Sequence, residues 1–338
     1  MDDSPRLEVI RTATVRATGG NHSRPPRQAE RGALVKVRAG VYAPSEMWHR
    51  LAEDEQHRLL VVETARRVQS EDASVSHLSS AVMWGIPHLG KPPAQVQLTT
   101  VHRGGSPPTH TRHHRTGSVP PTVMVDGVRC TSPARTVVDI ARTLSFASAL
   151  MAMDDALRRG LATVAEIQEA IEQLGRARGV SRAALVLSHA DALSESPGES
   201  LSRARMIQLG VPTPVLQFVV RDQDGVAGRV DYWWEAQNLA GEFDGAVKYG
   251  LDRSATGARE TRSGGGASGD PRVAAGGALA AEVVHREKLR EDRIRAARDC
   301  RMLRWTWDDA YDLPRFGAIM RRAGLLSGEP APDPRYLY

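Results

Sequence analysis

The stretch VDYWWEAQNLAGEFDG, residues 230–245, decides the fold of the C-terminal part of this chain. Two apolar runs, VDYWW and LAGEF, surround a short connection and predict two neighbouring β-strands. Glu242 and Asp244 lie two residues apart on the second strand, so they share one face. If the strands pair, Asp231 of the first strand comes beside them, and three carboxylates meet at the end of an apolar sheet.

Carboxylates this close together repel one another and raise each other's pKa unless a cation neutralises them. A hard cation such as Mg²⁺ (or Mn²⁺) prefers oxygen ligands, and its bound water can attack a phosphodiester. We therefore predict a metal site formed by Asp231, Glu242 and Asp244. The alternative for Asp244 is an ordinary Asp-Gly turn after a strand.

The flanking sequence predicts an α/β domain over residues 196–326. A helix opens at SPGES, where Ser196 is the expected cap and Glu199 is either a capping-box acid or a further catalytic acid. The strand LQFVVRDQ follows, and the helix REKLREDRIRAARD, the strand RMLRWTW and a terminal helix come after the quoted stretch. Between them, residues 250–283 are rich in Gly, Ala and Ser and are expected to form a flexible insertion.

The pattern D…E-x-D-G-x-x-K resembles the PD-(D/E)XK nuclease superfamily, and within it the very-short-patch-repair endonucleases. The matching segments are VDYWW, EFDG and REDRIRAA, at 230–234, 242–245 and 290–297. This resemblance implies a central sheet flanked by helices and Mg²⁺-dependent hydrolysis of DNA. It places Glu199 at a helical acid position and Lys248 where a histidine is common, as the group that stabilises charge. Asp244 replaces the lysine that is usual in the third motif of this superfamily.

Nearer the N-terminus, RGALVKVRAGVYAP (31–44) alternates apolar and basic residues and predicts a β-hairpin that turns at Ala39-Gly40. A short helical region before it completes the outline of a winged helix-turn-helix. One amphipathic helix is expected over 46–70. A second helix follows Ser76 and is expected to end at Gly85. Strands cover 94–101, 109–115 and 122–132, the last with a hairpin turn at Asp126-Gly127, and Ser132 caps another helix.

Residues 23–142 resemble the antitoxins of AbiE-type (type IV) toxin–antitoxin systems, through the hairpin, SVSHLSSAVMWG and VDGVRCTSPARTVVD. The resemblance implies DNA binding and a partner toxin. Five cationic side chains are expected to contact phosphates: Arg24, Arg27, Arg31, Lys36 and Arg38. The alternative is that they are ordinary charged residues on the surface. Because proline disrupts a helix interior, we expect the recognition helix to start after Pro26.

The chain has 338 residues, 41% hydrophobic and 25% charged, which is typical of a globular protein with two or three domains. We expect an α/β (α+β overall) fold divided into a winged-helix-like module (1–70), an antitoxin-like middle region (71–192) and the nuclease-like domain (196–326). A net charge of +5 is compatible with DNA as partner. The two cysteines predict neither zinc site nor disulfide framework. No apolar run is long enough for a membrane span, and the start does not resemble a signal peptide, so we expect a cytoplasmic protein.

Ser76-His77 could suggest a nucleophile and a base, but no partner acid is evident in the sequence. Arg135 and Asp139 lie four residues apart on one helix and are expected to pair. Three hypotheses remain open: a metal-dependent DNA hydrolase, a non-catalytic DNA-binding regulator or antitoxin, and a protein that only neutralises a toxin. The intact acids favour the first, whereas the missing lysine and the insertion favour the second.

Overall fold

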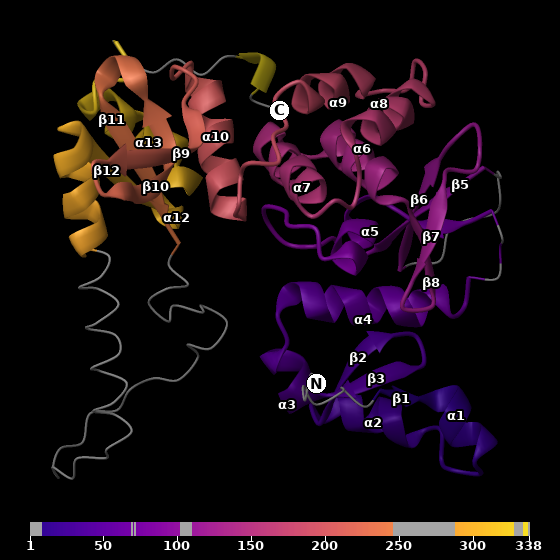
Figure 1. Ribbon diagram of the computed structural model, residues 1–338. Helices are drawn as coiled ribbons and strands as arrows, with labels where there is room; N and C mark the ends of the chain where they lie inside the picture. Colours follow the sequence, from indigo (N-terminus) through magenta and orange to yellow (C-terminus); the bar gives the residue numbers. More distant parts are fainter. Residues whose placement is uncertain are drawn as a thin grey trace, which may run out of the picture. The chain divides into compact units, whose positions relative to one another are not determined.

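The computed structural model describes residues 9–68, 70, 72–101, 110–245, 288–327 and 334–336. The chain forms two compact units (Figure 1). Unit 1 comprises residues 1–144 and 159–190, and unit 2 comprises residues 145–158 and 191–338. The break after residue 190 lies close to the boundary expected at 192–196, but α7 (Phe146–Arg158) joins unit 2, which the sequence did not indicate. Helices and three β-sheets make the fold α+β, as expected.

The first sheet of unit 1 has the order β1-β3-β2. Its strands are β1 (Ile10–Arg11), β2 (Leu34–Arg38) and β3 (Val41–Pro44), and the helices α1 (Thr12–Ala17) and α2 (Arg24–Glu30) lie between the first two in sequence. The expected hairpin is confirmed, because β2 and β3 pair antiparallel around Gly40, whose φ of +75° suits glycine.

Two expectations about helices in this region are wrong. Helix α2 begins at Arg24, before the two prolines rather than after them. Pro25 and Pro26 fall in the first turn, where backbone N–H groups have no intrahelical acceptor and a missing N–H costs nothing. The single helix expected over 46–70 is two helices, α3 (Ser45–Arg50) and α4 (Glu53–Ala65), because Leu51 is extended with ψ of 141°.

The second sheet of unit 1 has the order β6-β5-β4-β8-β7. Its strands are β4 (Ser74–Val75), β5 (Val96–Thr100), β6 (Thr111–Arg115), β7 (Thr122–Val125) and β8 (Val128–Thr131). Asp126 and Gly127 both have positive φ in the tight turn between β7 and β8, as the sequence predicted. Apolar residues of β4, β5 and β8 pack with Val61 of α4 and Met83 in one core.

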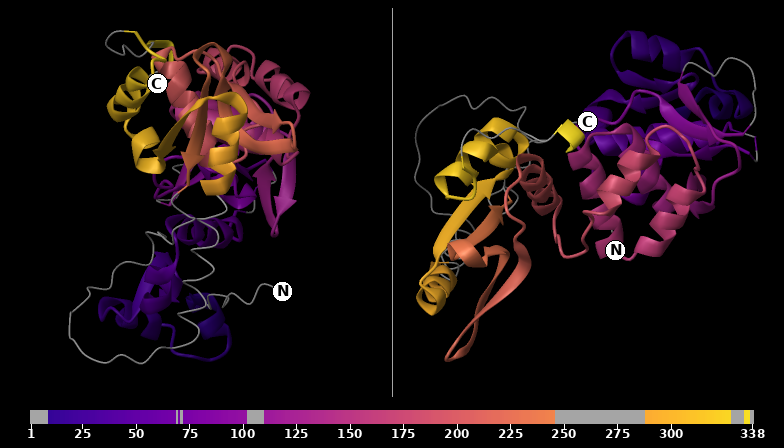
Figure 2. Two further views of the ribbon diagram at one scale, coloured as in Figure 1. Left: turned by 60° about the vertical axis from the view of Figure 1, so that its left-hand side comes forward. Right: turned by 90° about the horizontal axis from the view of Figure 1, so that it is seen from above.

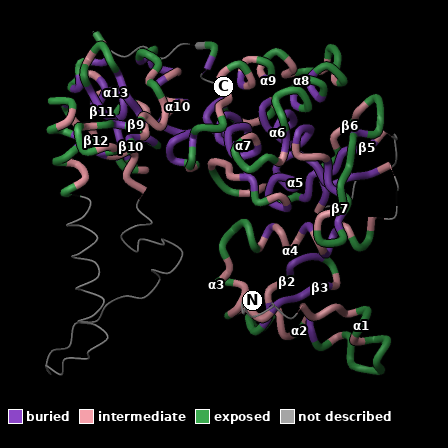
Figure 3. The backbone as a smooth tube through the Cα atoms, viewed as in Figure 1, coloured by how far each residue is buried: buried purple, intermediate pink, exposed green. Residues whose placement is uncertain are grey.

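Four helices complete unit 1: α5 (His77–Trp84), α6 (Pro133–Thr143), α8 (Val164–Glu172) and α9 (Val180–Leu187). The predicted caps are confirmed for two of them. Ser132 accepts a hydrogen bond from the Arg135 N–H at the start of α6, and α5 ends at Gly85 with φ of 63°. Buried residues gather along α5 and α6 (Figure 3).

The sheet of unit 2 has the order β12-β11-β10-β9. Its strands are β9 (Val215–Asp222), β10 (Gly225–Trp234), β11 (Leu239–Asp244) and β12 (Arg301–Thr306), and β9 and β10 form a long hairpin (Figure 2). Only the β11–β12 pair is parallel. The helices are α7, α10 (Pro197–Leu209), a helix over residues 288–298, α12 (Trp307–Tyr311) and α13 (Leu313–Arg322).

Helices cover both faces of this sheet. Neighbouring residues on a strand point to opposite faces, and Tyr232 and Trp233 of β10 are both buried. The Tyr232 hydroxyl donates to the Glu199 carbonyl of α10 at 2.9 Å. Trp233 stacks on Phe218 and lies in a cluster with Ile294 of the 288–298 helix.

Helix α10 approaches β11 so closely that one position tolerates only glycine. A Cβ at Gly198 would lie 2.0 Å from the ring of Phe243. We expect Gly198→Ala to lower the free energy of unfolding by about 2 kcal/mol or more, as overpacked cores do. Denaturant unfolding would measure the loss. Phe243→Leu should relieve much of it in the double variant, and an equal loss with and without Phe243→Leu would contradict this steric cause.

Candidate functional sites

The first candidate site is a basic surface on the N-terminal module. Arg24, Arg27 and Arg31 are exposed and lie on or just after α2, at spacings of three and four residues that place them on one helix face. Lys36 is exposed on β2 of the hairpin. Within the described residues none of these four side chains takes part in an ion pair, so their charges are available to a phosphate backbone.

Arg38, the fifth cation expected at this surface, is buried instead. Its side chain lies under α4, where Nη1 donates to the Glu63 carbonyl at 2.6 Å. Desolvation lowers the pKa of this guanidinium. Arg38 therefore joins the hairpin to α4, and we leave it out of the candidate basic surface.

The second candidate site is the acidic pocket of unit 2, a cavity of about 300 Å³. Asp231 of β10 lines it together with Glu242 and Asp244 of β11, so the three carboxylates predicted to meet do line one pocket. Three arginines line the same pocket, which the sequence did not indicate: Arg229, Arg290 and Arg304.

Two of these arginines hold Glu242. Arg290 binds its Oε1 at 2.7 Å, and Arg304 binds its Oε2 at 3.0 Å. Arg304 also pairs with Glu291 at 2.9 Å. Arg290 comes from the helix over 288–298 and Arg304 from β12, the strand parallel to β11. Both oxygens of Glu242 are thus occupied by guanidinium groups.

Asp231 is the acid of this pocket whose pKa is strongly raised. Its Oδ2 accepts a hydrogen bond from the Phe243 N–H at 2.8 Å. Burial raises the pKa of Asp231 to about 7, and the nearby Glu199 and Glu242 add to the rise. A carboxyl group with such a raised pKa costs stability when it ionises, which is common at functional sites.

The other two predicted residues lie apart from this pocket or outside the described residues. Glu199 accepts hydrogen bonds from the Glu195 N–H and from Gln217 Nε2, both at 2.9 Å, and does not line the pocket. Ser196 caps α10 as predicted, but Glu199 accepts from the N–H of Glu195, one residue before the cap, and not from the Ser196 N–H as a capping-box acid would. Lys248 and the insertion 250–283 lie outside the described residues.

As arranged here, the acids do not form a ligand set for Mg²⁺. In the described part of the chain, no group of three or more His, Cys, Asp or Glu side chains could hold a metal ion. At this pocket, both carboxylate oxygens of Glu242 are bound by Arg290 and Arg304. The metal site therefore stays a prediction that requires these arginines to release Glu242.

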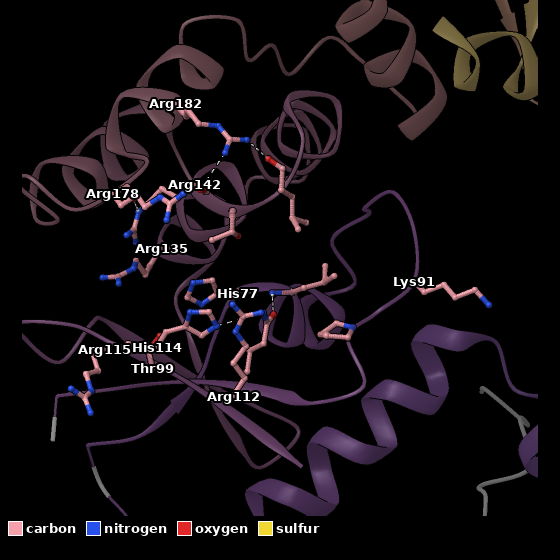
Figure 4. Close-up of a pocket in the computed structure, with 15 residues that line it drawn as sticks. His77, Lys91, Thr99, Arg112, His114, Arg115, Arg135, Arg142, Arg178 and Arg182 are labelled. Carbon is pink, nitrogen blue, oxygen red and sulfur yellow. Dashed lines mark hydrogen bonds between the residues drawn. The ribbon is translucent and has the colours of Figure 1, made fainter. Parts of the chain in front are cut away.

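The third candidate site was not predicted: a basic cavity of about 560 Å³ in unit 1 (Figure 4). One side, the helical wall, carries arginines of α6, of α9 and of the segment leading into α9: Arg135, Arg142, Arg178 and Arg182. The opposite side, the sheet wall, carries Arg112 and Arg115 of β6. Lys91 also lines the cavity, and no acidic side chain is among the described residues that line it.

Two stacked histidines lie between these walls. The rings of His77 and His114 are 3.6 Å apart between centroids. Burial, together with the neighbouring arginines, lowers the pKa of His77 to about 3 and that of His114 to about 4, so both are neutral at neutral pH. His77 is also strained, with φ of 52°.

An acid does lie near His77, contrary to the sequence expectation. Asp139 Oδ2 is 3.8 Å from His77 Nδ1 and 3.0 Å from Arg135 Nε, which confirms the predicted Arg135–Asp139 pair. Ser76 Oγ is also bonded to His77 Nδ1, at 3.0 Å. A nucleophilic triad needs the serine and the acid on different ring nitrogens, so these residues form no such triad.

Residues 76–189 match the family model of the AbiEi antitoxin C-terminal domain. The expected resemblance to AbiE-type antitoxins is confirmed for this part, which contains α5, α6 and the whole basic cavity. The nuclease-like character of the C-terminal domain stays a prediction. None of the helices in the described residues is long and apolar enough to cross a membrane.

Two curated proteins of Mycobacterium tuberculosis, Uncharacterized protein MT2308 and Uncharacterized protein Rv2248, are each 40% identical to this chain over 121 residues. The match covers 36% of this chain and 44% of each relative, so the chain spans less than half the length of these relatives. The crystal structure of the RV2827C protein from Mycobacterium tuberculosis aligns with a TM-score of 0.35 and 15% identity, over 59% of this chain and 76% of that one. This likeness is too slight to support an inference.

Proposed function

We propose that this protein is a DNA-binding regulator of the antitoxin type. The observation that carries the proposal is the match of residues 76–189 to the AbiEi antitoxin C-terminal domain. An antitoxin needs two partners, the toxin that it neutralises and, where it also represses its own operon, the operator DNA. We assign the antitoxin role to the middle region and DNA binding to the N-terminal module.

The geometry of the N-terminal module supports DNA binding. Helix α2 and the β2–β3 hairpin have the order of a recognition helix and a wing. Arg24, Arg27 and Arg31 line one face of α2, and Lys36 lies on the hairpin. Contacts of this kind to phosphates supply most of the affinity and fix the position of the protein without reading the sequence.

The test is incubation of the full chain with supercoiled plasmid and with a duplex that covers its own upstream region, with and without Mg²⁺. We expect retarded but intact DNA, with affinity that falls steeply as salt rises. Co-expression with the adjacent gene tests the toxin partner, since an antitoxin must restore growth that the toxin arrests. No retardation at low salt would contradict the DNA-binding half of the proposal.

A second candidate function is metal-dependent hydrolysis of phosphodiesters by unit 2. One observation favours it: Asp231, Glu242 and Asp244 line the same pocket. If Arg290 and Arg304 released Glu242, these acids would hold Mg²⁺ or Mn²⁺, which would supply an activated water, with Lys248 to stabilise charge. In the plasmid experiment, nicking by the wild type that both Asp231→Ala and Glu242→Ala abolish would establish this activity. Nicking that the variants retain would identify a contaminant.

A further inference from the structure

We propose that the basic cavity of unit 1 binds a free ligand of the nucleoside di- or triphosphate class, held by its phosphoryl groups between the helical wall and the sheet wall. This inference does not rest on DNA binding by the N-terminal module. The cavity volume of about 560 Å³ falls within the range of small-molecule sites, about 300–1,000 Å³. An inorganic phosphate ion would fill only a small part of it, so the volume favours a ligand with an organic part as well as phosphates.

The lining is rich in positive charge and suits an anionic ligand. Six arginines and Lys91 line the cavity, whereas no acid is among the described residues that line it. Lys91 is paired with Glu53, so the arginines carry this argument. The two neutral histidines add no charge at neutral pH. A concave surface of one sign focuses the electric field and concentrates the opposite ion. Guanidinium groups match phosphate oxygens with paired N–H donors, so a ligand with several phosphoryl charges relieves the repulsion best.

The helical wall is organised before any ligand arrives. Asp139 lies behind the wall and is bonded to both Arg135 and Arg142, each at 3.0 Å, without lining the cavity. The Arg142 Nε–H donates to the Arg178 carbonyl at 2.8 Å, and Arg182 donates to the Leu144 carbonyl. These bonds use only part of the five N–H donors of each arginine. A wall fixed in this way loses little conformational entropy when it binds an anion.

The histidine pair completes the site. His77 is 4% exposed and keeps an unfavourable positive φ at the first residue of α5. Such strain in a residue other than glycine persists where the surrounding structure enforces it, and it is concentrated at functional sites. The ring of His114 lies against it, and Figure 4 shows both imidazoles between the arginines of the two walls. Nδ1 of His77 bonds to Ser76 Oγ, and Nε2 of His114 lies 3.5 Å from Gln97 Nε2, so the other nitrogen of each ring is the one left for a phosphoryl oxygen.

The phosphates of a nucleic acid have the same chemistry as those of a free nucleotide. The experiment therefore has to distinguish a free nucleotide from a nucleic-acid strand as the ligand. A polynucleotide backbone follows an open groove, whereas this cavity is bounded by α6 and α9 on one side and β5 and β6 on the other. Two facing walls suit a free ligand held from both sides, and the oligonucleotide titration below tests whether a strand binds there instead.

The experiment is calorimetric titration of the full chain with ATP, GTP and pyrophosphate, and separately with a short single-stranded oligonucleotide. The test variant is Arg112→Ala/Arg178→Ala, which removes one exposed arginine from each side of the cavity. A hydrogen bond to a charged group is worth about tenfold in affinity. We therefore expect wild type to bind one nucleotide per chain and the variant to bind it about 100-fold more weakly.

Arg176→Ala/Arg221→Ala is the matched control, because both arginines are exposed and neither lines the cavity. It loses the same charge and should bind the nucleotide as wild type does, as should Arg24→Ala/Arg27→Ala/Arg31→Ala. Failure of ATP, GTP and pyrophosphate to bind at millimolar concentration would overturn the proposal. So would equal weakening in the control, or binding of the oligonucleotide alone with loss in the cavity variant.

Discussion

Replacement of Arg24, Arg27 and Arg31 by alanine is expected to weaken duplex DNA binding about 500-fold at 0.1 M salt. The reason is counterion release: each phosphate contact changes log K by about 0.9 per decade of salt, or about eightfold between 1 M and 0.1 M salt. Three such contacts from the exposed face of α2 multiply to that factor. The same variant should show a salt slope that is shallower by about 3.

Fluorescence anisotropy of a labelled duplex over a range of salt concentrations measures both quantities. The control is Arg176→Ala/Arg221→Ala/Arg322→Ala, which removes three exposed arginines outside the N-terminal module. It should keep both the affinity and the slope. If the α2 variant loses no more than the control, phosphate binding is not located on α2, and DNA binding, if present, belongs to another surface.

Local signals in the sequence predicted local structure well. The Ala39-Gly40 and Asp126-Gly127 turns form hairpins in which Gly40, Asp126 and Gly127 adopt the positive φ that glycine and aspartate tolerate. Ser132 and Ser196 cap helices because their hydroxyls accept first-turn N–H groups. The break at Leu51 was missed because the apolar spacing of two short helices imitates that of one long helix.

Pairings between distant segments were predicted less well, since they depend on which side chains the fold brings together. Asp231 and Glu242 do line one pocket, as two neighbouring strands required. No pattern near Glu242 indicated Arg290 or Arg304, because one follows the insertion and the other lies on β12. Arg38 alternates with apolar residues like any exposed strand residue, and its burial follows from the position of α4.

The spacing of the arginines that line the basic cavity is visible in the sequence, but it did not lead to a prediction of the cavity. Arg135 and Arg142 are seven residues apart on one face of α6, whereas Arg178 precedes α9 and Arg182 lies within it. Each pair alone indicates only a solvated surface. Their convergence depends on the approach of α9 to α6, which periodicity does not reveal.

Asp231→Asn is expected to stabilise unit 2 at pH 8 by about 2 kcal/mol. The pKa of Asp231 is raised from 3.8 to about 7, so the folded state holds a proton that the unfolded state has already lost. The wild type therefore loses stability as the pH rises from about 4 to about 7. The full linkage is about 4 kcal/mol at 1.36 kcal/mol per pKa unit, and partial exposure of Asp231 to water justifies about half of it. Asparagine keeps an oxygen for the Phe243 N–H and carries no charge.

Guanidinium unfolding of both proteins at pH 4.5 and at pH 8, followed by tryptophan fluorescence, measures this difference. Four of the six tryptophans lie in unit 2: Trp233, Trp234, Trp305 and Trp307. The gain in free energy of unfolding of Asp231→Asn over the wild type should be small at pH 4.5 and complete at pH 8. Asp222→Asn is the control of opposite sign, because the hydrogen bond from Arg293 lowers the pKa of Asp222 and its loss should destabilise unit 2 above the normal carboxyl range.

The same variant tests the metal-dependent function proposed for unit 2. If Asp231 holds a divalent cation, Mg²⁺ should stabilise the wild type at pH 8 and leave Asp231→Asn unchanged, because a ligand that binds only the folded state shifts unfolding. If the acid has no cation to hold, Mg²⁺ should affect neither protein and the variant should stay more stable throughout. A variant no more stable than wild type at pH 8 would contradict the raised pKa of Asp231.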